Sequence, residues 1–280
     1  MMQFGGFKKW ALPVTACAFG LVMSFSAQAE DSLAKAKQAG ELVIGSEFQF
    51  APFDFTENGV HKGVNVDVMD QVGKALGIKI KYVDLPWSSV LPGLDAGKYD
   101  MVTGPVTVTK ERMEHYRFTV PIADASVAFL KRTDDKSINK PADVAGKTIG
   151  SQKGSSQLEQ TKIFADGLPG KASMREYIDF NQAYADLAAG RLVAVGNSLP
   201  NIAYVAIQRP EIFTVIHPTF GAKTYFAYLG RKDADSKALL DAIDAQLIAM
   251  QKDGRLSAIH KKWFGTPMEL PSHPVDKPTI

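Results

Sequence analysis

Cysteine is almost absent from the sequence. The 280 residues contain one, Cys17, which lies in an N-terminal stretch with the features of an export signal. Lys8 and Lys9 precede the apolar stretch 11–25, and the tripeptide Ala-Gln-Ala at 27–29 matches the pattern of a signal-peptidase site. Cleavage after this tripeptide removes the cysteine. We therefore expect an exported chain with no disulfide, no thiol nucleophile and no thiolate metal site.

A long apolar run is also lacking at this end of the chain. The stretch 11–25 is shorter than the roughly 20 residues that a membrane helix needs. Cys17 follows Val-Thr-Ala at 14–16, which loosely fits a lipoprotein site, but only seven residues separate it from Lys9. That spacing is at the lower limit for the apolar core of a signal. We therefore expect the later cut, after Ala29, and export to the periplasm.

Charge of one sign is not in excess. Segment 1–29 holds two basic and no acidic residues, so the remaining 251 residues carry 30 basic and 30 acidic side chains. Such a balance argues against nucleic acid or an anionic membrane surface as a partner. A chain of this length can bury a large core, either as one big domain or as two lobes.

Signatures of catalysis and metal binding are missing as well. The five histidines are scattered singly, and neither H-E-x-x-H nor G-x-S-x-G occurs. The segment PADVAGKT at 141–148 resembles a phosphate loop, but Pro141 stands where the first glycine is needed. We therefore assign no metal, no cofactor and no catalytic residue.

What the sequence does contain is an alternation of short apolar strands with amphipathic helices. In the first half we expect strands at 42–45, 78–83 and 99–104, and helices at 66–76 and 87–97. After residue 125 the alternation resumes, with strands at 148–151, 191–196 and 224–231, and helices at 155–167, 181–190, 199–208, 239–248 and around 259–263. Four prolines after Gly265 indicate an irregular surface strap. This order predicts an α/β fold with largely parallel sheets.

The stretch TGPVTVTKER at 103–112 admits two interpretations. In the simpler one, a strand ends and a helix begins, with Thr109 as the N-cap and Arg112 in water. In the other, the stretch is an anion-binding corner. Backbone N–H groups and the Thr107 hydroxyl would then face a carboxylate that Arg112 holds with two parallel hydrogen bonds.

Several motifs in order carry a resemblance over almost the whole chain after the signal. They are FAPFDF (50–55), KGVNVDV (62–68), WSSVLPGLDAGKYDMVTG (87–104), TVTKER (107–112), VAGKTIGSQKGSS (144–156), LAAGRLVAV (187–195) and MQKDGRLSAIHKKWFG (250–265). In these segments the chain resembles the polar amino-acid-binding proteins of bacterial ABC importers, the extracellular solute-binding proteins of family 3.

The resemblance implies a two-lobe periplasmic-binding-protein fold of type II. Lobe 1 would comprise 30–124 and 221–280, and lobe 2 would comprise 125–220. The ligand would lie between the lobes, and a hinge would close them around it. The closed form would dock on a membrane permease, and we expect the protein to be a monomer.

The resemblance also favours the anion-binding interpretation of 103–112. It implies that Arg112 and Thr107 bind the carboxylate of a small molecule, and that Ser155 or Ser156 approaches the same group from lobe 2. A helix begins at those serines, and its free N–H groups suit an anion.

Three further residues are implied by the same resemblance. Phe50 and Trp87 match the aromatic pair that holds the ligand side chain, although the commoner fate of such residues is an ordinary core. Glu47 matches the acid that binders of basic amino acids place against a distal cation. The alternative for Glu47 is a solvated carboxylate at a strand end.

Two positions depart from the family pattern. Ser198, with Asn197 beside it, stands where the family has an aspartate for the α-ammonium group of the ligand. Pro105 stands where Gly or Ser is usual, and it removes a backbone donor, although the Gly104 carbonyl can still accept. We therefore expect an amino acid or a derivative of one, polar and either basic or opine-like, and a carboxylate without the α-amine stays open.

Two other functions are compatible with the same motifs. An exported dehydratase of the cyclohexadienyl or arogenate type would need a general acid or base, and Glu47 is the one clear choice. A sensor subunit would present its ligand to a receptor instead of a permease. Turnover of the ligand separates the enzyme from the binders.

Overall fold

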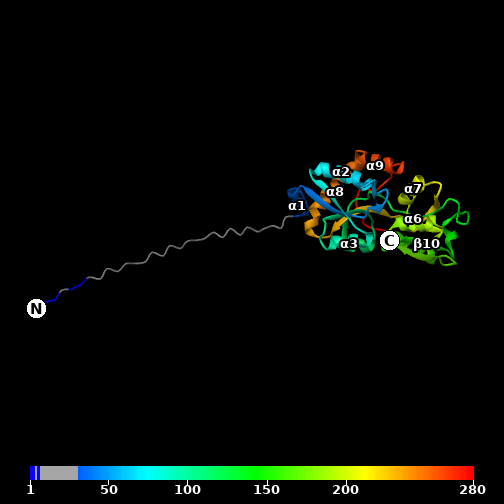
Figure 1. Ribbon diagram of the computed structural model, residues 1–280. Helices are drawn as coiled ribbons and strands as arrows, with labels where there is room; N and C mark the ends of the chain where they lie inside the picture. Colours follow the sequence, from blue (N-terminus) through cyan, green and yellow to red (C-terminus); the bar gives the residue numbers. More distant parts are fainter. Residues whose placement is uncertain (4, 7–30) are drawn as a thin grey trace.

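The computed structural model describes residues 1–3, 5–6 and 31–280. The predicted cleavage site after Ala29 and the alternative at Cys17 lie outside the described residues. Residues 31–280 form two lobes that lie side by side, and each is built on its own β-sheet (Figure 1). We call the part that carries the first sheet lobe 1 and the other part lobe 2.

The sheet of lobe 1 has six strands. Their order is β5 (Lys79–Asp84), β1 (Glu41–Ser46), β6 (Met101–Thr107), β14 (Tyr225–Arg231) and β7 (Tyr116–Phe118), with β8 (Ala123–Asp124) also paired to β14. Strands β5, β1 and β6 are parallel, whereas β14 runs antiparallel to β6, β7 and β8. The carboxyl ends of β1 and β6 therefore lie at one edge, which is where Glu47 and the segment after Thr107 begin.

Lobe 2 repeats this plan with a five-stranded sheet. Its order is β11 (Ser173–Tyr177), β10 (Thr148–Gln152), β12 (Ala194–Ser198), β9 (Val127–Arg132) and β13 (Phe213–Phe220). Again the first three strands are parallel, and β9 is antiparallel to both of its neighbours.

The expectation of largely parallel sheets was only partly correct. Both sheets are mixed, because β14 and β9 lie next to the crossings between the lobes and enter their sheets in the reverse direction. The sequence patterns also missed β9, β11 and β13, and the three-stranded sheet of β2 (Gln49–Phe50), β3 (Asp54–Glu57) and β4 (Val60–Lys62).

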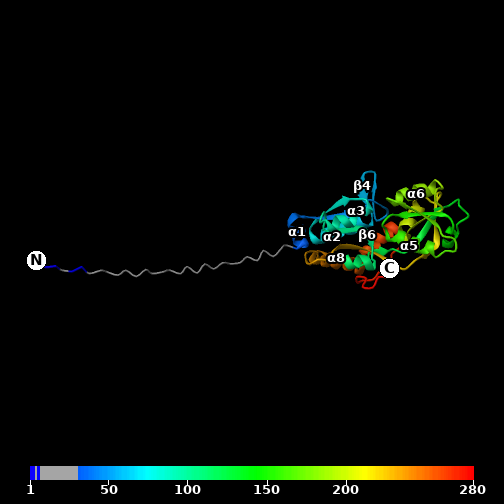
Figure 2. The ribbon, with the colours of Figure 1, turned by 90° about the horizontal axis from the view of Figure 1, so that it is seen from below.

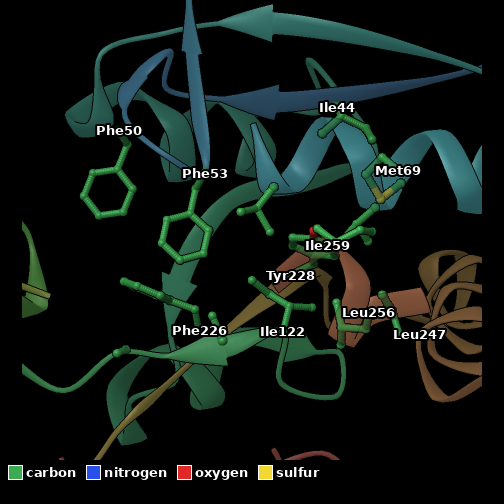
Figure 3. Close-up of a cluster of buried hydrophobic side chains, with 14 of the residues drawn as sticks. Ile44, Phe50, Phe53, Met69, Ile122, Phe226, Tyr228, Leu247, Leu256 and Ile259 are labelled. Carbon is green, nitrogen blue, oxygen red and sulfur yellow. The ribbon is translucent and has the colours of Figure 1, made fainter. Parts of the chain in front are cut away.

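Helices cover both faces of the lobe 1 sheet because its strands alternate their apolar side chains between the two faces. They are α1 (Ser32–Ala39), α2 (Val64–Leu76), α3 (Trp87–Asp95), α4 (Lys110–His115), α8 (Ala234–Lys252) and α9 (Arg255–Phe264). Ile44 and Tyr228 face the core under α2, α8 and α9, whereas Val102 and Leu229 face α3. Figure 3 shows the first of these cores, where Phe50, Phe53 and Phe226 pack at the end nearest lobe 2.

Lobe 2 has the same three layers. Its helices are α5 (Ser156–Asp166), α6 (Phe180–Ala188) and α7 (Leu199–Gln208), together with the 3₁₀ turn η1 (Pro141–Val144). Figure 2 shows α5 and α6 on the part of lobe 2 that faces lobe 1. The predicted helices therefore occur close to their expected positions, and α7 matches its prediction at both ends.

The chain crosses between the lobes twice, at 125–126 and at 221–224. The two crossings are joined by hydrogen bonds, since Ala125 N donates to Thr224 O at 2.9 Å and Thr224 Oγ1 donates to Ala125 O at 3.1 Å. The predicted strap after Gly265 is confirmed, because 266–280 contains no helix or strand. Among the described residues, every helix is too short or too polar to cross a membrane.

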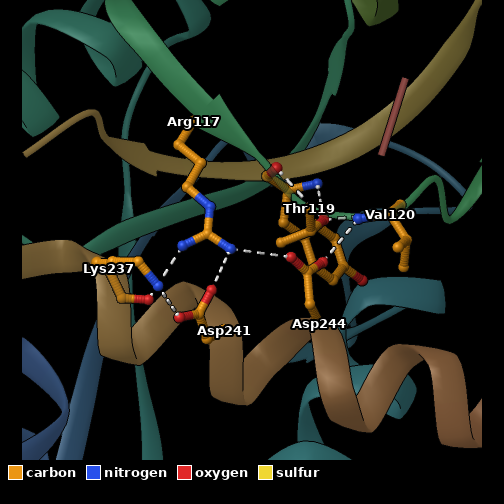
Figure 4. Close-up of polar contacts among 7 residues, drawn as sticks. Arg117, Thr119, Val120, Lys237, Asp241 and Asp244 are labelled. Carbon is orange, nitrogen blue, oxygen red and sulfur yellow. Dashed lines mark hydrogen bonds and ion pairs between the residues drawn. The ribbon is translucent and has the colours of Figure 1, made fainter. Parts of the chain in front are cut away.

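A polar network attaches α8 to the edge of the lobe 1 sheet (Figure 4). Arg117 donates to Asp241 Oδ1 at 2.5 Å and to Asp244 Oδ2 at 3.3 Å, and Asp244 Oδ1 accepts from Val120 N at 2.7 Å. Burial raises the pKa of Asp244, and its two donors offset part of that effect. This cluster is structural, because none of its residues lines the cleft between the lobes.

Candidate ligand-binding cleft

The cleft lies between the two lobes, at the carboxyl ends of β1, β6 and β10. Lobe 1 contributes seven lining residues and lobe 2 contributes three, namely Glu47, Phe50, Trp87, Gly104, Pro105, Thr107 and Arg112, and Gln152, Ser155 and Gln157. Eight of these ten were predicted from the sequence. The structure thus brings residues that are more than 100 positions apart in the chain to one cavity.

Arg112 is held in the cleft by the short helix α4. Thr109 is the N-cap of this helix, as predicted, and its Oγ1 accepts from Arg112 N at 3.2 Å. The Arg112 guanidinium donates from Nη1 to Thr107 O at 3.1 Å, and its central carbon lies 5.3 Å from the ring centroid of Trp87. The structure therefore does not support the simpler interpretation, in which Arg112 lies in open water.

Electrostatics make Arg112 an anion site. Burial lowers its pKa to about 10, so the guanidinium is still charged at neutral pH. In the part of the chain that the structure describes, no carboxylate forms an ion pair with it. Among the described residues, the contacts of the guanidinium are the hydrogen bond to Thr107 O and the ring of Trp87, and a partly buried cation of this kind is the group that a carboxylate ligand satisfies best.

Lobe 2 faces Arg112 with the N-terminus of α5. Ser155 is the N-cap, and its Oγ accepts from Leu158 N at 3.0 Å and donates to Gln152 O at 2.7 Å. Because the hydroxyl is occupied by these bonds, the free groups at this helix start are the backbone N–H groups of Ser156 and Gln157. The Ser156 side chain lies in an adjoining recess with Arg112, not in the cleft itself.

The two aromatic residues have different surroundings. The Trp87 ring lies under Arg112, and its Nε1 donates to Gly154 O of lobe 2 at 3.0 Å. Phe50 lines the cleft with one edge but is otherwise core, because it packs against Phe226 of lobe 1 and Phe180 of lobe 2, with ring centroids 6.0 and 5.6 Å away. Both the core interpretation and the ligand-wall interpretation therefore apply to Phe50.

Glu47 lines the cleft and also a second groove, whereas Arg112 lines the cleft and a different recess. Its side chain is not a solvated carboxylate, since only 4% of the residue is exposed. Gln152 of lobe 2 donates from Nε2 to Glu47 Oε1 at 2.6 Å. Burial raises the pKa of Glu47 to about 8, the bonds from Gln152 and from the Trp87 backbone oppose the rise, and the carboxylates of Asp179 and Asp84 add to it.

Two lining residues were missed by the sequence patterns, Gln152 and Gln157. Gln152 is the last residue of β10, and Gln157 is in the first turn of α5. Gln152 comes directly after the predicted strand 148–151, and Gln157 lies in the first turn of the predicted helix 155–167. The signal available in the sequence was therefore their place on either side of the loop between these two elements. Glutamine is common on surfaces, and composition alone did not distinguish them.

Asn197 and Ser198 were predicted as ligand contacts, and neither lines the cleft. Both are fully buried at the end of β12. Asn197 Nδ2 donates to the Tyr184 hydroxyl at 2.8 Å, and the Ser198 hydroxyl bonds to Oδ1 of Asn201. Asn201 in turn donates to Ala51 O of lobe 1 at 2.7 Å. The two residues therefore support a contact between the lobes.

In this structure the lobes touch each other around the cleft. Besides the bonds from Gln152, Trp87 and Asn201, the Asn181 side chain of lobe 2 donates to Gln49 Oε1 at 2.7 Å. The described residues include no group of His, Cys, Asp and Glu side chains that is suited to a metal ion. The site is thus a cleft between the lobes whose lining contains one cation, Arg112, and one buried carboxyl, Glu47.

Comparison with known families gives a match that covers most of the chain. The family of bacterial extracellular solute-binding proteins, family 3, matches residues 42–266. The chain belongs to this family. Its two-lobe α/β fold and its binding cleft are those of a solute-binding protein, as the motifs predicted.

Relatives of this solute-binding protein are named for amino acids. The L-cystine-binding protein TcyJ of Escherichia coli K12 is 29% identical over 255 residues, which are 90% of this chain and 93% of TcyJ. Among solved structures, an ancestral arginine-binding protein bound to arginine is 30% identical, with a TM-score of 0.73 over 81% of this chain and 99% of that one.

One further solved structure bears on the enzyme alternative. The ancestral amino acid-binding protein AncCDT-1, described as a precursor of cyclohexadienyl dehydratase, is 28% identical, with a TM-score of 0.75 over 83% of this chain and 99% of that one. The fold of this solute-binding protein is therefore also close to the ancestor of an enzyme.

Proposed function

We propose that this solute-binding protein captures an amino acid, or a derivative of one, by its carboxylate in the periplasm and delivers it to the permease of an ABC importer. The observation that carries the proposal is Arg112, a cation without an ionic partner among the described residues, next to Thr107 and opposite the N-terminus of α5. The names of relatives support the amino-acid class.

The proposed cycle uses the two crossings between the lobes as a hinge. The moving units are 30–124 with 221–280, and 125–220. A carboxylate bound to Arg112 brings α5 of lobe 2 against it, and the closed monomer then docks on the permease. Ordinary side chains suffice for this cycle, with neither a cofactor nor a chemical step.

The nitrogen of the ligand has fewer evident partners in the cleft than its carboxylate has. Ser198 supplies no carboxylate, and it lies outside the lining of the cleft. Glu47 is the acid among the described lining residues, and its Oε1 accepts from Gln152. These placements support a solute whose nitrogen is bound by neutral acceptors such as the Gly104 carbonyl, as in an opine-like conjugate.

The test is to release the bound solute and then to remove Arg112. Residues 30–280 are purified and denatured, and mass spectrometry identifies what is released. We expect one small carboxylate from the wild type and none from Arg112→Ala, because an unpaired carboxylate in a dry cleft costs about 3–5 kcal/mol. Arg191→Ala, which changes an exposed cation of lobe 2, is the control. Unchanged retention by Arg112→Ala contradicts the proposal.

A dehydratase is the second function, and Glu47 favours it. A buried carboxyl whose pKa is raised to about 8 is mostly protonated at neutral pH and can act as a general acid. Incubation of the protein with prephenate and with arogenate, followed by chromatography of the products, tests it. Turnover that Glu47→Gln abolishes would establish the enzyme, whereas solute recovered unchanged supports the binder.

A further inference from the structure

One part of the cleft is closed by two side chains from different lobes. Glu47 follows β1 of lobe 1, and Gln152 ends β10 of lobe 2. They meet through the 2.6 Å bond from Nε2 to Oε1, and each is at least 96% buried, with 4% and 2% exposed. Because the bond joins the lobes, it forms only when the cleft is closed.

The Gln152 amide is held in one orientation. Its Nε2 also donates to Ile178 O at 3.1 Å, so both N–H groups of the amide are in use. Glu47 therefore faces a donor from Gln152 and a second donor from the Trp87 backbone. The hydrogen atoms of both donors already occupy the space beside the Glu47 carboxyl in which a cationic ligand group would have to bind.

Beyond this pair lies an outer groove, which opens to solvent. It is lined by residues of both lobes, namely Glu47, Gln49, 84–86, Ile178, Asp179, Asn181, Gln182 and Ala185. Glu47 lines both the cleft and the groove, so it is part of the wall between them. The charged groups around Glu47 on the groove side are Asp84 and Asp179, and both are acidic.

These surroundings leave Glu47 without an ionic partner in the closed protein. Its pKa of about 8 means that only about a tenth of the side chains are ionised at pH 7. A protonated carboxyl has an O–H to donate and a carbonyl oxygen that accepts from Gln152. A neutral ligand group that accepts a hydrogen bond fits this arrangement, whereas a cation has to expel the proton and compete with Gln152 for the same oxygen.

We propose that Glu47 and Gln152 form a neutral closing pair that selects a solute whose far end is an uncharged hydrogen-bonding group, such as an amide, over one that ends in a cation. The inference rests on the proposed function, because it assumes that the carboxylate of the solute is bound at Arg112. It makes Gln152, which no sequence motif indicated, a specificity-determining residue.

The experiment compares two solutes that differ only at the far end. L-Citrulline and L-arginine share length, carboxylate and α-amine, but the first ends in a neutral urea and the second in a guanidinium. Isothermal titration with residues 30–280 at pH 7 is expected to show citrulline binding at least tenfold tighter. Arginine that binds as tightly as citrulline, or more tightly, overturns the inference.

The pH dependence of the affinity ratio supplies a second readout. Titration of the α-amine, which both solutes carry, cancels in the ratio of the two affinities. Asp84 and Asp179 are the acidic neighbours of Glu47 in the wild type, and both are kept in every variant compared. The preference for citrulline is expected to fall at least threefold between pH 6.5 and pH 9, as Glu47 loses its proton. In Glu47→Gln the ratio is expected to be independent of pH. A wild-type ratio that does not change with pH also overturns the inference.

Variants of two glutamines separate an effect on selection between the two solutes from an effect on closure of the lobes. Gln152→Leu removes the donor to Glu47 and should narrow the citrulline preference at least threefold. Gln182→Leu changes a glutamine of the outer groove and should keep the wild-type ratio. Equal ratios in both variants contradict a role for Gln152. A wild type that binds neither solute likewise overturns the inference, whereas the proposed function is tested separately by Arg112→Ala.

Discussion

Two ionisable side chains that line the cleft respond to burial in opposite ways. Burial lowers the pKa of Arg112 to about 10 and raises that of Glu47 to about 8. Desolvation disfavours the charged form in both cases, but at pH 7 the guanidinium keeps its charge and the carboxyl is mostly neutral. The lining of the cleft therefore combines one ionic group with one that is mostly neutral.

The proton on Glu47 links stability to pH. The unfolded or open protein releases it near pH 4.5, whereas the closed protein holds it until about pH 8. The folded state thus binds more protons in this window, and its stability falls as pH rises through it. We expect the free energy of unfolding of Glu47→Gln to rise relative to that of the wild type by on the order of 1–2 kcal/mol between pH 5 and pH 8. The difference is limited because opening of the lobes reduces the cost of ionising Glu47 in the wild type.

Thermal unfolding of both proteins over this pH range measures that difference. Glu269→Gln, at an exposed position of the C-terminal strap, is the matched control and should follow the wild type at every pH. Parallel curves for wild type and Glu47→Gln would show that the carboxyl is ionised and solvated in the folded protein.

At the scale of elements, the placement of Arg112 depends on a helix of only six residues. Helix α4 spans Lys110–His115, and a helix this short has little stability of its own. It is held by the Thr109 cap at its start and by Lys110 N, which donates to Ile280 O of the C-terminal strap at 2.8 Å. The orientation of the guanidinium is therefore a property of the cap and the strap as much as of Arg112 itself.

Loss of the cap should lower stability and affinity together. Thr109→Val keeps the shape of the side chain but removes the oxygen that accepts from Arg112 N, which costs about 1 kcal/mol. Differential scanning calorimetry and titration with the recovered solute measure the two effects. Thr266→Val, outside the helices, should change neither. An unchanged affinity in Thr109→Val would mean that ligand binding alone orders α4.

At the scale of the whole molecule, binding depends on bonds that cross from one lobe to the other. The indole of Trp87 has two functions, as a wall under Arg112 and as a donor to Gly154 O of lobe 2 at 3.0 Å. The second function exists only in the closed form. A substitution that keeps the ring and removes the N–H therefore separates closure from the wall of the pocket.

Trp87→Phe should weaken solute binding about fivefold, equivalent to about 1 kcal/mol for one hydrogen bond. Trp263→Phe is the matched control, because its Nε1 donates to Asp67 Oδ2 at 2.7 Å within lobe 1. The Trp263→Phe variant should have a lower unfolding temperature than the wild type and an unchanged affinity for the solute. Small-angle scattering of the Trp87 variant without solute should show a larger radius of gyration. If both variants lose affinity equally, closure is not the cause.

Local patterns were enough for much of the architecture, and together with the family resemblance they indicated eight of the ten residues that line the cleft. Strand and helix periods predicted the α/β alternation and the bounds of α7, and the Thr109 cap follows from helix-start chemistry alone. Thr107 and Arg112 follow a predicted strand, so the residue pattern itself offered them as an anion-binding corner, whereas Trp87 was implied by the family resemblance. These features depend on neighbours within a few positions in the chain.

The remaining features depend on contacts between distant segments. The antiparallel entry of β9 and β14, the burial of Ser198 behind the cleft and the meeting of Glu47 with Gln152 involve partners about 70 to 150 positions apart or at the lobe boundary. Periodicity carries no information on which side chains two lobes bring together. The sequence by itself therefore determined the elements and the cation, whereas the packing of the lobes decided the state of Glu47, because desolvation arises only from the groups that surround it.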